Sequence, residues 1–283
     1  MPSAATIQHT AVTMPTSAQT QHARIRQAAA QFPPITLGEM DSVKLLNRRD
    51  TKYLTTEAIL LEVLADALKA GYRALETPGH AADKTPGPTA AQNPDTPAAQ
   101  APDASITKLS PYNSVYYDTP GLKTFLEIKR KNNHGRTKKK RTSIATNELM
   151  DFSSDAAATA YLAKHSTFTA EELSPALSTA FERITLVNPA MTERLTIDTA
   201  LKFENFRTDK RTDLKDAVII ELKQDGRAQS QMKGILLDHR VKELRISKYC
   251  IGTTLTCSAA KSNRFKEKVR ALEKIINKKI EVI

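Results

Sequence analysis

The chain has 283 residues, and its 42 lysines and arginines against 31 aspartates and glutamates give a formal net charge of +11 at pH 7. Only 40% of the residues are hydrophobic, and no apolar stretch approaches the roughly 18 residues that a membrane-spanning helix needs, which excludes a bilayer-embedded protein. We therefore expect a soluble protein whose positive charge serves an anionic partner.

The cysteine content indicates the redox state of the compartment, and the aromatic content limits the ways in which the protein can bind a partner. Cys250 and Cys257 are too few for a disulfide framework or a four-ligand zinc site, so we expect packed thiols in a reducing, cytoplasmic compartment. The absence of tryptophan and an aromatic content of 5% disfavour base stacking as the main binding device.

Two segments have compositions that disfavour a packed structure. Residues 1–36 contain no acidic residue and only two arginines, and they lack the apolar core of a secretory signal. We predict a disordered leader there, with an organelle transit peptide as the alternative. Residues 77–104 hold six of the fourteen prolines and no valine, leucine, isoleucine, methionine, phenylalanine or tyrosine. Such a segment cannot offset the entropy lost on ordering, and it predicts a flexible insertion.

Three segments carry apolar residues at helical spacing. Residues 56–72 form the clearest case, because Gly71 stands where a C-terminal cap belongs. Residues 265–276 repeat the pattern with lysines mostly outside the apolar stripe, and residues 228–239 give a third predicted helix. Each helix should pack its apolar side against another surface.

The remaining patterned segments alternate charged and aliphatic residues, which is typical of strands that have two different faces. Residues 183–187 and 192–198 predict a hairpin that turns at Asn188 and Pro189. The predicted strands are 48–52, 125–131, 183–187, 192–198, 201–206 and 217–223.

These faces lead to a hypothesis about chemistry. A sheet with one buried face and one charged, solvent-exposed face explains the alternation without a binding or catalytic role for the charged residues. However, the helices need an apolar surface, and if they cover the aliphatic faces of a curled sheet, the charged faces converge on one lumen. Burying many like charges is costly unless a ligand with several phosphates neutralises them. The few carboxylates would then balance charge or hold a divalent cation.

Six motifs resemble, in order, those of the VTC domain, the polyphosphate polymerase domain of the vacuolar transporter chaperone complex and of bacterial relatives, in the CYTH-like triphosphate tunnel superfamily. The whole match runs from about Leu45 to Arg270, and it includes a shorter match, NRFK at 263–266, after the last of the six motifs. The motifs are NRRDTKYLTT at 47–56, SVYYDTPGL at 114–122, LEIKRKNNHGRTKKKR at 126–141, RLTIDTALKFE at 194–204, VIIELKQ at 218–224 and SKYCIG at 247–252.

The resemblance implies an α+β fold over residues 37–283, in which an antiparallel β-barrel covered by helices forms a triphosphate tunnel. It implies that ATP and polyphosphate bind there, and that the γ-phosphoryl group passes to the growing chain with Mn or Mg as the divalent metal. The residues it assigns to catalysis are Lys52, Lys129, Lys139, Arg194, Lys223 and Lys248; further ATP contacts are Arg48, Arg141, Arg183 and Ser247; the metal ligands are Glu221 and Glu127.

The sequence departs from the family at one place. A strand of alternating basic residues, of the KxRxR kind, is missing between Pro120 and Leu126, where only five residues remain. A strand and a turn do not fit in that length, so the barrel should be incomplete. Two alternatives therefore stay open: a triphosphatase of the same fold, and a non-catalytic polyphosphate-binding module.

A dense basic run offers a further alternative. Eight of the thirteen residues in 129–141 are lysine or arginine, a composition also found in nucleic-acid-binding and nuclear-import segments. Because no aromatic residues accompany the run and no nucleic-acid-binding fold is recognisable, we expect no nucleic acid partner.

Overall fold

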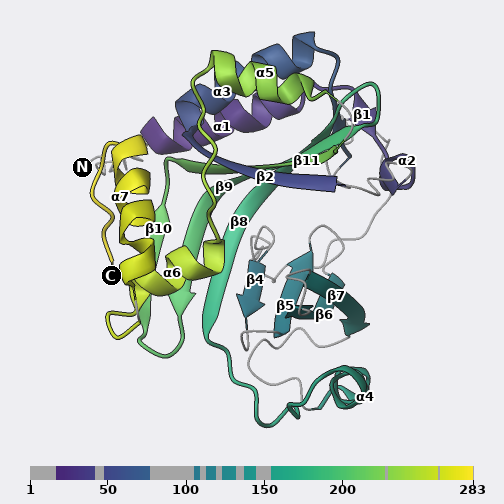
Figure 1. The fold of residues 1–283 in the computed structure, drawn as a ribbon, viewed down its shortest axis with the longest axis vertical. Coiled ribbons are helices and arrows are strands. Elements are labelled where there is room, and N and C mark those ends of the chain that lie inside the picture. Colours follow the sequence, from purple (N-terminus) through teal and green to yellow (C-terminus); the bar gives the residue numbers. More distant parts are fainter. Residues whose placement is uncertain are drawn as a thin grey trace, which may run out of the picture.

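The computed structural model describes residues 17–41, 48–76, 105–108, 113–118, 123–131, 137–144, 154–226, 229–260 and 262–282. The predicted flexible insertion at 77–104 lies outside these residues. The described chain is a mixture of helices and one large sheet, in agreement with the predicted α+β class (Figure 1).

The strands join into a single sheet. They are β1 (Pro34–Ile35), β2 (Arg48–Thr56), β3 (Arg73–Leu75), β4 (Ser105–Lys108), β5 (Asn113–Asp118), β6 (Lys123–Lys131), β7 (Thr137–Ile144), β8 (Leu177–Val187), β9 (Glu193–Asn205), β10 (Lys210–Leu214) and β11 (Ala217–Asp225). The main path of hydrogen-bonded neighbours is β2-β11-β9-β8-β4-β5-β6-β7, and all its pairs are antiparallel. Its ends, β2 and β7, form no ladder with each other in the described residues. The sheet is therefore not closed, and the predicted barrel is not confirmed.

The helices lie on both sides of this sheet. They are α1 (Ser17–Ala29), α2 (Leu37–Asp41), α3 (Glu57–Lys69), α4 (Ala156–His165), α5 (Gln231–Asp238), α6 (Lys248–Thr256) and α7 (Lys266–Ile275). In Figure 1, α1, α3 and α5 form a layer above β2 and β11, whereas α6 and α7 lie on the other side. The three predicted helices correspond to α3, α5 and α7. In the described residues, no helix is long and apolar enough to cross a membrane.

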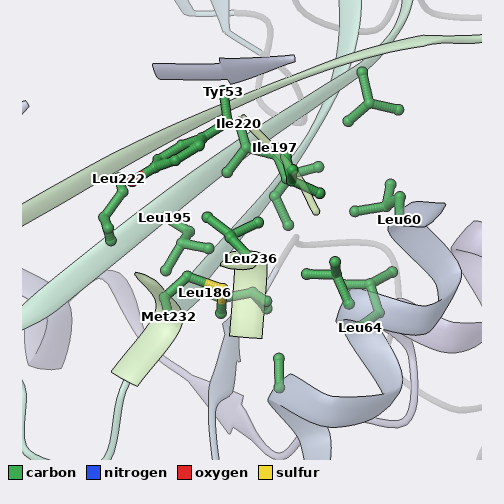
Figure 2. Packing of buried hydrophobic residues seen from close by; sticks show 14 of the residues in the cluster. Tyr53, Leu60, Leu64, Leu186, Leu195, Ile197, Ile220, Leu222, Met232 and Leu236 are labelled. Carbon is green, nitrogen blue, oxygen red and sulfur yellow. The ribbon is translucent and has the colours of Figure 1, made fainter. Parts of the chain in front are cut away.

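The first core lies between the sheet and the layer of α1, α3 and α5. Helix α3 begins where the Thr56 side chain accepts a hydrogen bond from the Ile59 amide at 3.4 Å, and it ends at Lys69, shortly before Gly71, whose φ of +78° suits glycine. Its apolar stripe meets the aliphatic faces of the strands, as Figure 2 shows. Buried members of this core include Leu60, Leu64, Leu186, Leu195, Ile197, Ile220, Leu222 and Leu236.

The N-terminal segment corrects one prediction. Residues 17–36, which the composition placed in a disordered leader, form α1 and β1 in the structure. Ile25 is 1% exposed and belongs to the first core, so one apolar anchor on an otherwise polar helix outweighs the segment's average composition. Ion pairs add to this anchor, because His22 and Arg26 both contact Glu182 of β8.

A β-bulge moves the apolar side of β9 from one face of the sheet to the other. Between Thr199 and Lys202, β9 has one residue more than β8, and Ala200 has a φ of +49°. Leu201 and Phe203 therefore lie in a second core beneath α6 and α7. At this end of the sheet, α6 and α7 therefore cover the face opposite to the one that α3 and α5 cover.

A third core lies beneath α4. Leu126 and Ile128 of β6 pack there with Leu162 of the helix, so the aliphatic face of β6 is covered as predicted. Strand β5 pairs directly with β6, from Asn113 opposite Ile128 to Asp118 opposite Lys123. The four residues between the two strands, 119–122, lie outside the described part of the chain.

Candidate functional site

The side of the sheet opposite the first core carries charged residues from four adjacent strands, and we call it the charged face. The strand registers align its members in rows. Lys52 of β2 lies opposite Glu221 of β11, which lies opposite Thr196 of β9; in the next row, Lys223 lies opposite Asp50 on one side and Arg194 on the other. The charged face consists of Asp50, Lys52, Arg183, Arg194, Thr196, Asp198, Glu221 and Lys223.

Glu221 lies between two lysines at the centre of this face. Lys52 Nζ is 3.5 Å from Glu221 Oε1, and Lys223 Nζ is 3.6 Å from Glu221 Oε2. Burial acts to raise the pKa of Glu221, but Lys223, Lys52 and Lys248 outweigh it, and the net pKa lies below the ordinary value. Burial in turn lowers the pKa of Lys223, and Glu221 opposes that change. The carboxylate is therefore ionised at neutral pH, within contact distance of two cations.

Asp198 of β9 lies opposite Arg183 of β8 and binds two cationic side chains. It is 2% exposed, Arg183 Nε donates to its Oδ1 at 2.6 Å, and Lys248 Nζ donates to its Oδ2. Burial raises the pKa of Asp198, yet the charges and hydrogen bonds of Lys248 and Arg183 bring it below the ordinary value. Lys248 is the first residue of α6, which the second core holds against β9, so a residue far along the chain reaches the charged face.

A second cluster of charge lies on β6 and β7. Glu127 is fully buried; Lys129 Nζ lies 2.9 Å from its Oε1, and Lys139 Nζ contacts its Oε2. The register places Lys129 opposite Lys139 and Glu127 opposite Arg141, which stacks on Phe125 at 4.9 Å. These side chains project from the face of β6 opposite the third core.

The two clusters influence each other electrostatically. Burial lowers the pKa of Lys129, Glu221 of β11 raises it, and Lys52 of β2 lowers it further. Such influence between partly exposed charges fades over about 8–10 Å. Along the sheet, however, β6 and β11 are separated by β9, β8, β4 and β5. The pKa of Lys129 therefore indicates an electrostatic influence between strands that are distant from each other along the sheet.

Two of the predicted site residues are not placed in either cluster of charged side chains. Arg48 begins β2, but its side chain lies outside the described part of the chain. The exposed Ser247 caps α6, where its Oγ accepts the Cys250 amide at 3.5 Å. Sequence reasoning did not assign Asp198 and Thr196 to the site, although both have the parity of Arg194, which was the available signal.

The remaining predicted residues lie on the two clusters. Those on the charged face or in contact with it are Lys52, Arg183, Arg194, Glu221, Lys223 and Lys248, and those of the β6–β7 cluster are Glu127, Lys129, Lys139 and Arg141.

The segments that supply the cationic side chains of this site can be compared with known protein families. Residues 123–257 match the VTC domain family model. The VTC domain match begins at the first residue of β6 and ends directly after α6, so it includes Lys129, Glu221 and Lys248, whereas Lys52 lies outside it. No curated protein matches the chain. The match supports the resemblance that the motifs indicate.

Proposed function

We propose that this chain is an ATP-dependent polyphosphate polymerase of the VTC type, which transfers the γ-phosphoryl group of ATP to a growing polyphosphate chain. The contacts of Lys52 and Lys223 with the two oxygens of Glu221 carry the proposal, and Lys129, whose pKa Glu221 influences, adds a cation from a distant strand. A site for a linear polyanion needs cations on more than one side.

The electrostatics favour an anionic ligand. Lys223 and Lys248 are only 17% and 20% exposed, and burial lowers the pKa of both. Holding several half-buried cations together costs free energy, which a ligand with several phosphates offsets through charge-assisted hydrogen bonds. Arg183 and Arg194 add guanidinium groups, which suit phosphate oxygens.

The two predicted metal ligands have different surroundings. Within the described residues, no three His, Cys, Asp or Glu side chains form a ready-made metal site. Mg²⁺ commonly takes one or two carboxylates, with phosphate oxygens and water as the other ligands. Glu221, which is 22% exposed and 3.5 Å or more from its lysines, fits that role; Glu127, which is buried between Lys129 and Lys139, fits charge balance instead. A divalent ion held by Glu221 would supply charge neutralisation at bridging phosphate oxygens.

The reaction would need little from the protein beyond positioning and charge. The terminal oxygen of the polyphosphate forms a bond to the γ-phosphorus while the bond from that phosphorus to the bridging oxygen of ADP breaks, and ADP leaves. Negative charge spreads over the transferring oxygens, and fixed cations stabilise it. Lys52, Lys223 and Lys129 are the residues that we place around this group.

The test is product analysis with purified protein, ATP and Mn²⁺. Chains longer than triphosphate should form, and Glu221→Gln and Lys223→Ala should each reduce their yield about tenfold or more. Loss of one charge-assisted contact of about 1.5–3 kcal/mol corresponds to roughly tenfold to hundredfold in affinity. Lys69→Ala, at a position 78% exposed on α3, is the matched control and should leave the product unchanged. Chain synthesis that survives both site variants would refute the residue assignment.

One observation favours a second candidate function. Direct pairing of β5 with β6 leaves out the basic strand of the family, and with it two cationic contacts to the triphosphate. A site with fewer contacts could hydrolyse triphosphate or only bind polyphosphate. Free phosphate as the sole product would indicate the triphosphatase, and salt-sensitive binding without turnover would indicate the binding module.

A further inference from the structure

Asp198 is the point at which three separate segments meet on the charged face. Arg183 of β8 donates twice to its carboxylate, from Nε to Oδ1 at 2.6 Å and from Nη2 to Oδ2 at 2.9 Å. Lys248 of α6 donates to the same Oδ2. A carboxylate that accepts three charge-assisted hydrogen bonds has its own position fixed, and it fixes the position of both partners.

The two cations also share an aromatic neighbour. Arg183 Cζ lies 4.8 Å and Lys248 Nζ 4.3 Å from the centroid of the Phe181 ring, which is 2% exposed. Two positive groups over one ring repel each other, and removal of the carboxylate between them would leave that repulsion uncompensated in a partly buried setting.

The hydrogen bond from Lys248 to Asp198 ties the first turn of α6 to the charged face. The other end of the helix is tied separately, because Asn205 Nδ2 donates to Thr256 Oγ1 at 3.1 Å. Lys248 lowers the pKa of Glu221, so its positive charge acts on both carboxylates. If Lys248 moved away from Asp198, the charge beside Glu221 would change as well.

We propose that Asp198 is a positioning residue of the phosphoryl-transfer site, which holds Arg183 and Lys248 side by side toward the bound triphosphate without touching the phosphates itself. The inference rests on the proposed function. An anion in a phosphate site weakens binding by like-charge repulsion, so its presence there is explained by the orientation of the two cations rather than by affinity.

The test compares Asp198→Asn with Asp209→Asn, which makes the same chemical change at an exposed turn of the same chain. Steady-state kinetics with ATP and Mn²⁺ should show kcat reduced about tenfold or more in Asp198→Asn, as for loss of one positioned transition-state contact. KM for ATP should stay constant or fall, because a repelling charge is gone. Asp209→Asn should match the wild type in both constants.

A second measurement follows the titration of the Lys248 side chain and does not depend on catalytic activity. In protein whose lysines carry ¹³C-methyl labels, the NMR resonance of Lys248, assigned with Lys248→Arg, should titrate at lower pH in Asp198→Asn than in the wild type, and should be unchanged in Asp209→Asn. If the wild type neither binds tripolyphosphate nor forms product, the proposed function fails, and this resonance still decides whether Asp198 positions Lys248. An unchanged resonance in folded Asp198→Asn overturns the inference.

The variant Asp198→Glu distinguishes the effect of the position of the carboxylate from the effect of its charge. It is also the variant to use if Asp198→Asn does not fold. It keeps the negative charge and moves it by one methylene group, so kcat should fall while KM changes little. Wild-type kcat in this variant would overturn the positioning role. A fall in apparent kcat that only matches the loss of folded protein would also overturn it, because that result describes a purely structural residue.

Discussion

Gly252 of α6 and Phe203 of β9 lie so close together that a β carbon on Gly252 would be 2.4 Å from Cδ1 of the phenylalanine ring. Gly252 is one helical turn beyond Lys248, so both face the sheet from the same side of α6. The missing side chain at Gly252 lets the helix approach β9, and this approach brings Lys248 to Asp198.

Gly252→Ala should therefore reduce both stability and activity. Overpacking of a filled core costs typically about 1–3 kcal/mol, and outward movement of α6 would separate Lys248 from Asp198. Urea unfolding measures the first effect and polyphosphate synthesis the second. Gly234→Ala in α5 is the matched control: a β carbon there meets nothing within 4 Å, and alanine should stabilise the helix by up to about 1 kcal/mol. Equal stability of the two variants would contradict the close packing.

The role of α1 in the fold can be tested at Ile25. Truncation of a buried isoleucine to alanine costs about 2–5 kcal/mol, so Ile25→Ala should lower the free energy of unfolding by that amount. Gln27→Ala changes an exposed position of the same helix and should have little effect. If α1 were a detached leader, the two variants would be equally stable.

Phosphate binding should weaken as the pH rises, before ordinary lysines lose their charge. Burial lowers the pKa of Lys223 and of Lys129 below 10.5, so both become neutral earlier than exposed lysines. Their protonated forms oppose folding, and this penalty is relieved in the same pH window. Calorimetric titration with tripolyphosphate at constant ionic strength measures the effect. Lys223→Arg should retain affinity to higher pH, because arginine stays charged above about pH 12.

The attachment of α1 should depend on pH through His22. Its Nε2 is 2.6 Å from Glu182 Oε2 and its Nδ1 is 3.7 Å from Glu57 Oε1, with Arg26 beside the same Glu182. Hydrogen bonds with Glu182 and Glu57 raise the pKa of His22 to about 9 from 6.5. A raised folded-state pKa means stabilisation that is complete below pH 6.5 and disappears as the pH rises through 9. The Tm difference between wild type and His22→Gln should shrink across that window; a constant difference would contradict the assignment.

The alternation of side chains determined which residues lie on each face of the strands. Leu195 and Ile197 lie in the first core and Arg194 and Asp198 on the opposite face, because successive side chains of a strand point to opposite sides. The ends of α3 were predictable for the same local reason, since Thr56 and Gly71 act within a few residues of the chain.

Tertiary structure decided the features that depend on distant segments. The bulge at Ala200, the anchoring of Ile25 and the reach of Lys248 to Asp198 require packing partners that a local pattern does not contain. The order of paired strands from β2 to β7 also depends on distant segments, because strand pairing is a contact between segments far apart in sequence. The sequence by itself determined the kinds of side chain available to the site and the face on which each lies. Only the pairing of the strands and the seating of α6 brought these side chains together, because both depend on contacts between segments far apart in the chain.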